Sequence, residues 1–147
     1  MIKKLSALFI ALALATTAQP AGEAPEENPT APLIFAAIQT SNLPWLKKLI
    51  TTGTRTTGLG LLSFAASHRR AEIVSYLLKE AHADVDEQDE LGRTAAHLAA
   101  RMGATQIVEE LVNNGADMTI ADQFGRVPQE YYDGSDEKLT RLLTPEY

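Results

Sequence analysis

The apolar positions of this chain fall into pairs of short stripes, each spaced like the buried face of a helix. In the clearest pair, small residues at 95–100 form the first stripe. The second stripe, at i, i+1, i+4 and i+5, consists of Ile107, Val108, Leu111 and Val112. Gly103 separates the stripes, and Gly115 follows the second, where a residue able to adopt positive φ ends a helix. The pattern predicts a helix, a tight turn, a second helix and a polar loop.

The polar residues of the loops recur at a fixed interval. Three pairs share one and the same separation along the chain: Asp84 and Asp117, Asp89 and Asp122, and Gly92 and Gly125. A constant period of about 33 residues is typical of a stacked array of helical units, with one unit in each period.

The stretch from Asp89 to Pro128 resembles one whole ankyrin repeat and the start of the next. The family pattern is roughly D-x-x-G-x-T-P-L-H-x-A-A-x-x-G-x-x-x-I-V-x-x-L-L-x-x-G-A-D. The matching positions are Asp89, Gly92, Thr94, His97, Ala99, Ala100, Gly103, Ile107, Val108, Leu111, Gly115, Ala116 and Asp117. Ala95 and Ala96 stand where the family has proline and leucine. The resemblance implies an all-α ankyrin-repeat solenoid of about four helix-turn-helix units.

We expect the repeat domain to span 30–147, with units at about 30–57, 58–88, 89–121 and 122–147. The terminal units are expected to be degenerate because one face of each meets water. In the first unit, Thr30 should cap a helix, and Pro44 should open the next.

Two irregularities are visible in the later units. The segment 81–92, which connects the helices of the second unit to those of the third, carries one residue more than its successor. In the fourth unit, Tyr131 and Tyr132 replace the expected small residues, and a final helix is predicted over 136–143.

The segment 1–18 is expected to be a signal peptide. Lys3 and Lys4 precede an apolar run over 5–15 that is short for a membrane span, and Ala18 provides a small residue at a cleavage site. Cleavage after Ala15 or Ala21 and a retained anchor are the alternatives. Residues 19–29, rich in proline and glutamate, are expected to be a flexible leader. We therefore expect export to the periplasm, with secretion as the alternative, and no stable membrane insertion after cleavage.

Charge and cysteine content narrow the class of protein. The whole chain has 13 basic and 19 acidic residues, and cleavage removes two lysines, which leaves 11 − 19 = −8. Without a basic stripe to neutralise phosphates, nucleic acid is not an expected partner. The chain has no cysteine, which excludes a lipid-anchored lipoprotein and a disulfide framework.

The sequence favours no enzyme, cofactor or metal site. It has three histidines and lacks an H-E-x-x-H motif, a phosphate-binding glycine loop and a G-x-S-x-G elbow. The resemblance gives His97 a structural role, tying the helix start at Thr94 to a neighbouring turn, and makes Gly103 and Gly115 structural as well. The acidic segment 84–90 invites a calcium hypothesis, but its spacing does not fit a twelve-residue calcium loop, so a solvated loop is favoured.

The resemblance also implies a partner-binding surface made of loop tips and the ends of the inner helices. Those positions here are Ser67, His68, Glu90, Leu91, Arg93, Arg101, Met102, Gln123, Phe124 and Arg126. Three of them are apolar side chains that the stack should not need, and arginines lie around them, a composition typical of protein interfaces. The alternative is that Leu91 and Phe124 pack down on their own loops.

Together these observations predict a non-catalytic protein–protein interaction module, expected to be a monomer, in the bacterial periplasm. The resemblance extends to bacterial ankyrin proteins of two kinds: immunity proteins that neutralise toxins, and accessory proteins of oxidative-stress defence that support enzymes such as catalases. A secreted effector is a further alternative. The sequence does not choose among these roles and does not identify the partner protein.

Overall fold

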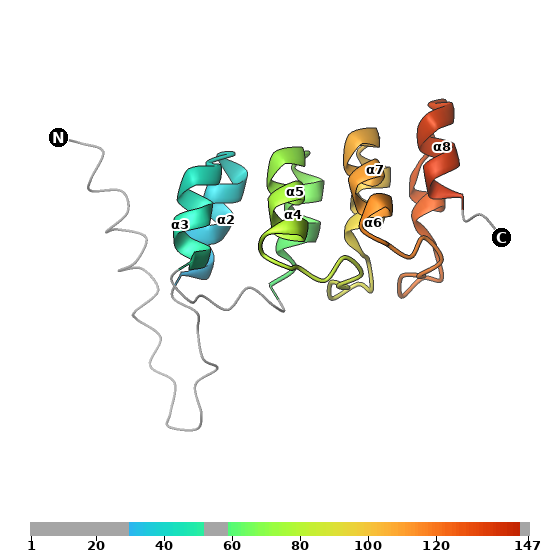
Figure 1. Ribbon diagram of the computed structural model, residues 1–147. Coiled ribbons are helices and arrows are strands. Elements are labelled where there is room, and N and C mark those ends of the chain that lie inside the picture. The colour runs from blue at the N-terminus through green and yellow to red at the C-terminus, as the bar shows by residue number, and fades with distance from the viewer. Residues whose placement is uncertain (1–29, 52–58, 145–147) are drawn as a thin grey trace, which may run out of the picture.

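The computed structural model describes residues 30–51 and 59–144, which form a row of helix pairs (Figure 1). The pairs are α2 (Ala31–Gln39) with α3 (Leu43–Thr51), α4 (Leu61–Ser67) with α5 (Ala71–Lys79), α6 (Ala95–Arg101) with α7 (Thr105–Asn113), and the 3-10 helix η1 (Pro128–Tyr131) with α8 (Glu137–Leu143). The described ranges contain no strand. The predicted all-α repeat solenoid is therefore confirmed. The predicted signal peptide and the leader over 19–29 lie outside the described residues.

We call α2, α4, α6 and η1 the inner row, and α3, α5, α7 and α8 the outer row. The loops 84–93 and 117–126, which connect one pair to the next, are called the first and second finger. None of the helices within 30–51 and 59–144 is both long and apolar enough to span a bilayer.

The turn inside each of the first three pairs has the same backbone geometry. Ser41, Arg69 and Gly103 occupy equivalent places and have φ values of 57°, 57° and 59°. Only glycine adopts this left-handed conformation without steric cost, so the first two turns carry a strain that the third avoids. The sequence showed the glycine but gave no sign that serine and arginine take its place.

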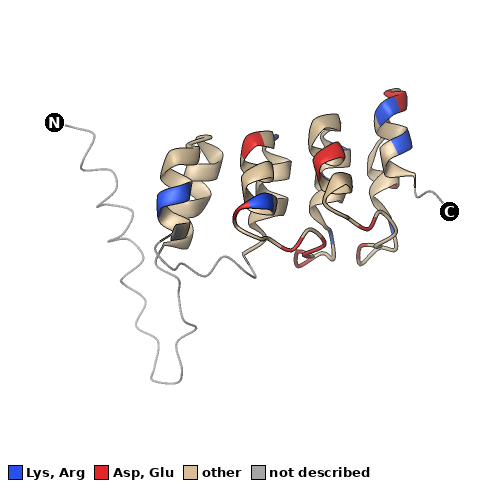
Figure 2. Cartoon of the chain, viewed as in Figure 1, with Lys and Arg blue, Asp and Glu red and all other residues tan. Residues whose placement is uncertain are grey.

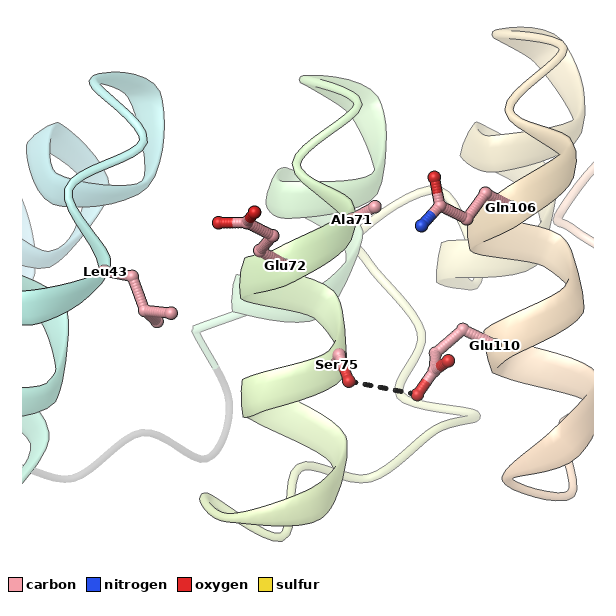
Figure 3. Close-up of a pocket in the computed structure, with 6 residues that line it drawn as sticks. All are labelled: Leu43, Ala71, Glu72, Ser75, Gln106 and Glu110. Carbon is pink, nitrogen blue, oxygen red and sulfur yellow. Dashed lines mark hydrogen bonds between the residues drawn. The ribbon is translucent and has the colours of Figure 1, made fainter.

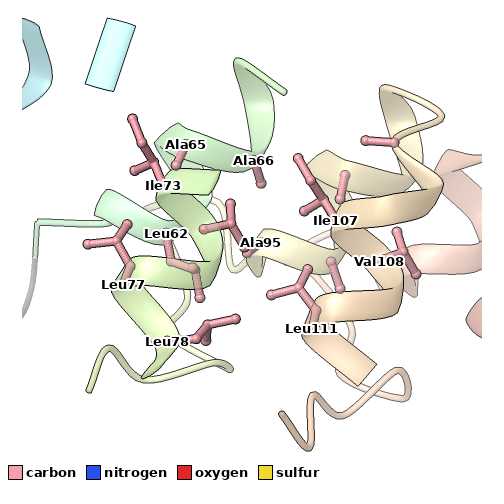
Figure 4. Packing of buried hydrophobic residues seen from close by; sticks show 14 of the residues in the cluster. Leu62, Ala65, Ala66, Ile73, Leu77, Leu78, Ala95, Ile107, Val108 and Leu111 are labelled. Atoms are coloured by element: carbon pink, nitrogen blue, oxygen red, sulfur yellow. The ribbon is translucent and has the colours of Figure 1, made fainter. Parts of the chain in front are cut away.

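The hydrophobic core lies between the two rows and runs through all the units. Small residues such as Ala65 and Ala99 are fully buried and let neighbouring inner helices approach closely. Larger side chains of the outer row fill the remaining space, including Ile73, Leu77 and Leu111, each at most 1% exposed (Figure 4). Each such side chain contributes about 1.5–3 kcal/mol by burial, so stacking of units holds the fold together.

The additional residue of the segment after α5 sits at the end of that helix. Ala83 N–H donates to the Leu77 carbonyl, as Ala116 N–H donates to that of Leu111 in the next unit. Ala83 lies one position further from Leu77 than Ala116 lies from Leu111, so the extra residue falls between Leu77 and Ala83. His82, with φ 52°, stands next to Ala83 in the left-handed conformation that a glycine has before Ala116.

The terminal units depart from the others, as expected. Thr30 stands at the N-cap position of α2, but its side chain makes no capping hydrogen bond, so the capping prediction is wrong. In the fourth unit the inner helix is reduced to η1, and α8 begins at Glu137 because the Asp136 carboxylate accepts the N–H groups of Lys138 and Leu139. Leu139 and Leu143 are fully buried against the third unit.

Candidate functional site

The tips of the two fingers are copies of one turn. In the first finger, Asp89 N–H donates to the Arg93 carbonyl, and the Asp89 Oδ1 atom accepts the N–H groups of Leu91 and Arg93, all at 2.9 Å. The Arg93 guanidinium donates to the Asp89 Oδ2 atom at 2.7 Å. Asp122, Phe124 and Arg126 make the equivalent hydrogen bonds in the second finger. In each finger, therefore, one aspartate holds the turn by accepting backbone N–H groups, and the arginine of the same turn donates to that aspartate.

Asp122 has one further partner, Tyr131, whose hydroxyl donates to the Asp122 Oδ2 atom. Burial by itself would raise the pKa of this carboxyl. The hydrogen bonds from Tyr131, from the N–H groups of Arg126 and Phe124, and from the Arg126 guanidinium outweigh burial and hold the pKa well below its usual range. Asp122 is thus ionised and fully used by the fold, and it does not serve as a proton donor.

The two fingers are also joined to each other. Gln123 N–H donates to the Leu91 carbonyl at 3.0 Å, and Asp117 N–H donates to Asp86 Oδ1 at 2.9 Å. Gly92, with φ 73°, lies at this contact, where a Cβ atom would stand 3.0 Å from the Gln123 nitrogen. These hydrogen bonds therefore hold the two fingers side by side and fix the spacing between them.

His97 links the inner row to the second finger. Its Nδ1 atom accepts hydrogen bonds from Thr94 N–H at 3.1 Å and from the Thr94 hydroxyl at 3.0 Å. Its Nε2 atom donates to the Arg126 carbonyl at 3.0 Å, so the ring is neutral with its proton on Nε2. Burial lowers the pKa of His97, which stabilises this form. The hydrogen bonds of His97 leave it no free nitrogen for a metal or a substrate.

An open groove of about 700 Å³ lies between the inner row and the first finger. Phe35 of α2 and Phe64 of α4 lie on its helical side, with their rings in edge-to-face contact at 4.9 Å. The lining consists of Phe35, Leu59, Gly60, Ser63, Phe64, Ser67, Glu87, Gln88, Asp89, Glu90, Leu91, Arg93, Leu98 and Arg101. We call the surface made by the inner row and the two fingers the concave face.

The groove brings together half of the predicted partner-binding residues: Ser67, Glu90, Leu91, Arg93 and Arg101. His68 lies beside it, with its ring centroid 4.2 Å from that of Phe64. Gln123, Phe124 and Arg126 lie on the second finger and do not line the groove. Met102 departs from expectation: it is partly buried and packs against the core, so it is not a spare apolar side chain.

Sequence reasoning missed the aromatic part of the groove. Phe64 of α4 was not among the predicted partner-binding residues, yet it is partly exposed and lines the groove. Its equivalent in the next unit is Leu98. A phenylalanine beside Ala65 and Ala66 was the available signal, but its meeting with Phe35 of the preceding unit depends on how the units stack.

Two apolar side chains project from equivalent finger tips. Phe124 is 65% exposed and Leu91 is 37% exposed, so Phe124 in particular does not pack down on its own loop. The guanidinium of Arg126 lies 5.1 Å from the centroid of the Phe124 ring, a cation–π contact that leaves most of the ring accessible. Phe124 therefore adds little to the stack and places an exposed apolar ring on the second finger, outside the groove lining.

The aspartate carboxylates of the first finger accept hydrogen bonds from backbone N–H groups of the loops. Asp84 Oδ1 accepts the N–H of Asp86, and Asp86 Oδ1 accepts the N–H of Asp117. Across 30–51 and 59–144, no three histidine, aspartate or glutamate side chains are placed to hold a metal ion. The acidic loop is accounted for as a structural connection between fingers.

A second hollow, of about 360 Å³, lies on the outer row (Figure 3). Glu72 of α5 points toward α3, whereas Glu110 of α7 accepts a hydrogen bond from the Ser75 hydroxyl at 3.1 Å. The hydrogen bond from Lys79, at 2.7 Å, is the largest cause of the lowered pKa of Glu110. The two carboxylates do not converge on a common point, so this hollow offers no acid–base pair.

Comparison with known proteins gives relatives over part of the chain. Tyrosine-protein kinase Shark of Drosophila melanogaster is 32% identical over 90 residues, which are 60% of this chain and 10% of the kinase. Protein phosphatase 1 regulatory subunit 27 is 33% identical in Mus musculus and 31% in Homo sapiens, over 86 residues that make up 58% of this chain and 55% of each subunit. The chain thus spans about half of the phosphatase subunits and a tenth of the kinase. These relatives are eukaryotic proteins.

The family model described as ankyrin repeats, in three copies, matches residues 26–122. This match covers more than half of the chain and includes both fingers over most of their length. Ankyrin repeats, together with relatives named as regulatory subunits, point to a protein–protein interaction module with a protein partner. The helix pairs, the paired fingers and this match lead to one conclusion: the chain belongs to the ankyrin-repeat family.

Proposed function

We propose that this protein binds another protein through its concave face and has no catalytic role. The observation that carries the proposal is the pair of exposed apolar side chains at equivalent finger tips, Leu91 in the groove lining and Phe124 on the second finger. Protein interfaces combine such apolar anchors with arginine, and Arg101 is exposed at the groove. Specific association then comes from this patch, while the buried framework of the repeats keeps it rigid.

The proposed place of action is the bacterial periplasm, after removal of residues 1–18. Support comes from the basic start at Lys3 and Lys4, the apolar run over 5–15 and the small residue Ala18. Within the periplasm, the proposed role is that of an immunity protein, which blocks a toxin by forming a stoichiometric complex through the concave face. A role in supporting a stress-defence enzyme such as a catalase is distinguished from this one by the identity of the partner.

A pull-down from periplasmic extract tests the binding surface. The bait is the chain from Gln19 onward, compared with a Leu91→Ser, Phe124→Ala variant of the concave face. A Glu72→Gln, Gln106→Ala variant of the outer row is the matched control. We expect one partner that is captured by the unmodified bait and the control but not by the concave-face variant. Equal capture by all three baits would contradict binding through this face.

Export is tested separately by expressing the full chain in a Gram-negative host and measuring the intact mass of the protein in the periplasmic fraction. We expect a mass that corresponds to a chain beginning at Gln19. Full-length protein confined to the cytoplasmic fraction would contradict the proposed localisation, without bearing on the binding surface.

A further inference from the structure

The two fingers carry most of the net negative charge of the protein. Their acidic residues are Asp84, Asp86, Glu87, Asp89, Glu90, Asp117 and Asp122, and their basic residues are Arg93 and Arg126. The net formal charge of the fingers is therefore 2 − 7 = −5, against −6 for the whole chain. Figure 2 shows these acidic positions along the connecting loops, whereas lysine and arginine lie largely on the helices.

The two arginines of the fingers are each paired with an aspartate of the same finger, so they do not neutralise the remaining carboxylates that a partner meets. Arg93 Nη2 lies 2.7 Å from Asp89 Oδ2, and Arg126 Nη2 lies 3.2 Å from Asp122 Oδ2. Glu90, in contrast, is exposed and forms no hydrogen bond or ion pair with any described residue. The finger side of the groove thus has a negative potential that an incoming partner meets.

The same groove offers apolar surface a short distance from these carboxylates. Phe35 and Phe64 lie on its helical side, and Leu91 follows Glu90 on the finger. Arg101 is the exposed positive charge of the lining, on α6, and the described residues give it no carboxylate partner. The groove therefore combines an apolar helical side, an acidic finger side and one opposing charge.

We infer that the groove binds an extended segment of a partner protein in which an apolar side chain is flanked by lysine or arginine. This inference rests on the proposed function and specifies the chemistry of the partner. The apolar side chain lies against Phe35 and Phe64, and the basic side chains face Glu90 and the net negative charge of the fingers. A volume of about 700 Å³ accommodates a few side chains of such a segment. The charge of the fingers attracts it from solution and makes association sensitive to salt.

The test is selection of binders from a random peptide library against the immobilised full chain. Selected peptides are then synthesised, and their affinities are measured by fluorescence anisotropy at low and high salt. We expect enrichment of peptides with at least one apolar residue next to lysine or arginine. Their affinity should fall as salt rises, because screening weakens attraction between exposed charges.

Three variants test how charged and apolar side chains of the groove contribute to peptide affinity while the fold stays intact. Glu90→Gln should weaken the selected peptides about two- to fivefold, the size expected for one rim charge. Arg101→Gln should leave their affinity unchanged or raise it, because it removes the opposing charge. Leu91→Ser should weaken binding while leaving the far-ultraviolet circular dichroism spectrum unchanged, since Leu91 is partly exposed on a finger.

The outcomes distinguish this inference from the proposed function. Enriched peptides without basic residues that lose affinity with Leu91→Ser would overturn the inference and retain concave-face binding. Peptides of any charge that bind all the variants equally would count against both. Failure to enrich any peptide would overturn the linear basic segment as the occupant, and the pull-down would still decide whether a folded partner uses the concave face.

Discussion

The Nε2 atom of His97 donates a hydrogen bond to the carbonyl of Arg126, on the second finger, at 3.0 Å. This bond joins the start of α6 to the second finger, while Nδ1 of the same ring accepts from Thr94. The bond at Nδ1 requires the neutral ring, since a protonated Nδ1 cannot accept, whereas Nε2 donates in either protonation state. The contact between His97 and Thr94 at the start of α6 is therefore coupled to the protonation state of one buried histidine.

We predict that the free energy of unfolding decreases as the pH falls below about 6.5. In the folded protein, burial lowers the pKa of His97 below 6.5, the value for the unfolded chain. Between the folded and the unfolded pKa, the unfolded chain therefore binds more protons. The contribution of His97 to the free energy of unfolding is then fully present above the pKa of the unfolded chain, and it is lost as the pH falls toward the pKa of the folded protein. Denaturant titrations at about pH 7.5 and about pH 5.5 measure the effect.

His97→Gln is the control for this pH dependence. Glutamine can accept and donate hydrogen bonds but does not titrate, so the variant should be less stable at neutral pH and should lose less stability on acidification. An unchanged pH slope in this variant would mean that another group causes the acid sensitivity.

Gly92→Ala should destabilise the fold more than Gly125→Ala. Both glycines have positive φ, 73° and 76°, so each substitution carries about 1–2 kcal/mol of backbone strain. At Gly92 the added Cβ also lies 3.0 Å from the Gln123 nitrogen, whereas at Gly125 it meets nothing within 4 Å. We expect an additional cost of about 1 kcal/mol or more at Gly92, measured by urea unfolding. Equal costs would indicate that the fingers are not held at this spacing in solution.

Arg69→Gly should stabilise the protein. Arg69 has φ 57°, and relief of about 1–2 kcal/mol of strain exceeds the roughly 0.5–1 kcal/mol of backbone entropy that a glycine adds to the unfolded chain. Gly103→Ala is the reciprocal control at the equivalent turn, where the new Cβ has no close neighbour and only backbone strain is added. Thermal unfolding should shift upward for the first variant and downward for the second.

Leu111→Ala should destabilise the fold by about 2–5 kcal/mol, because its side chain is fully buried between units and truncation leaves a cavity. Leu142→Ala, at a partly exposed position of α8, should cost less.

Phe124→Ala should change the free energy of unfolding by no more than about 0.5 kcal/mol, since its side chain is largely exposed. A large effect of Phe124→Ala would show that this ring supports the fold and is not a spare apolar side chain.

The sequence was informative wherever the determining contacts are local. The stripe containing Ile107 and Leu111 is set by the spacing of one helix, and Gly103 and Gly115 mark its turns. The helix predicted at 136–143 is observed one residue shorter, with Asp136 as its cap. Helix geometry imposes these periods within a few residues, so they can be read without knowledge of the neighbouring units.

The irregular unit shows where local patterns fail. The sequence revealed one extra residue between the second and third units but did not place it. Several positions of a polar loop can absorb an insertion, and the structure puts it at the end of α5, where His82 takes a left-handed conformation. Arg93 likewise appeared to be a surface residue for a partner, yet it is held by Asp89 of its own turn.

By itself, then, the sequence determined the all-helical repeat, its period and the residues that form each helix pair, because these follow from side-chain spacing along a single chain segment. The tertiary structure decided which side chains meet in space: Phe35 against Phe64, Met102 on the core, and His97 on the second finger. These contacts join segments that are distant along the chain, and they depend on how far one unit is displaced and rotated on the next. That offset is set by packing of the whole interface, which no single stretch of sequence specifies.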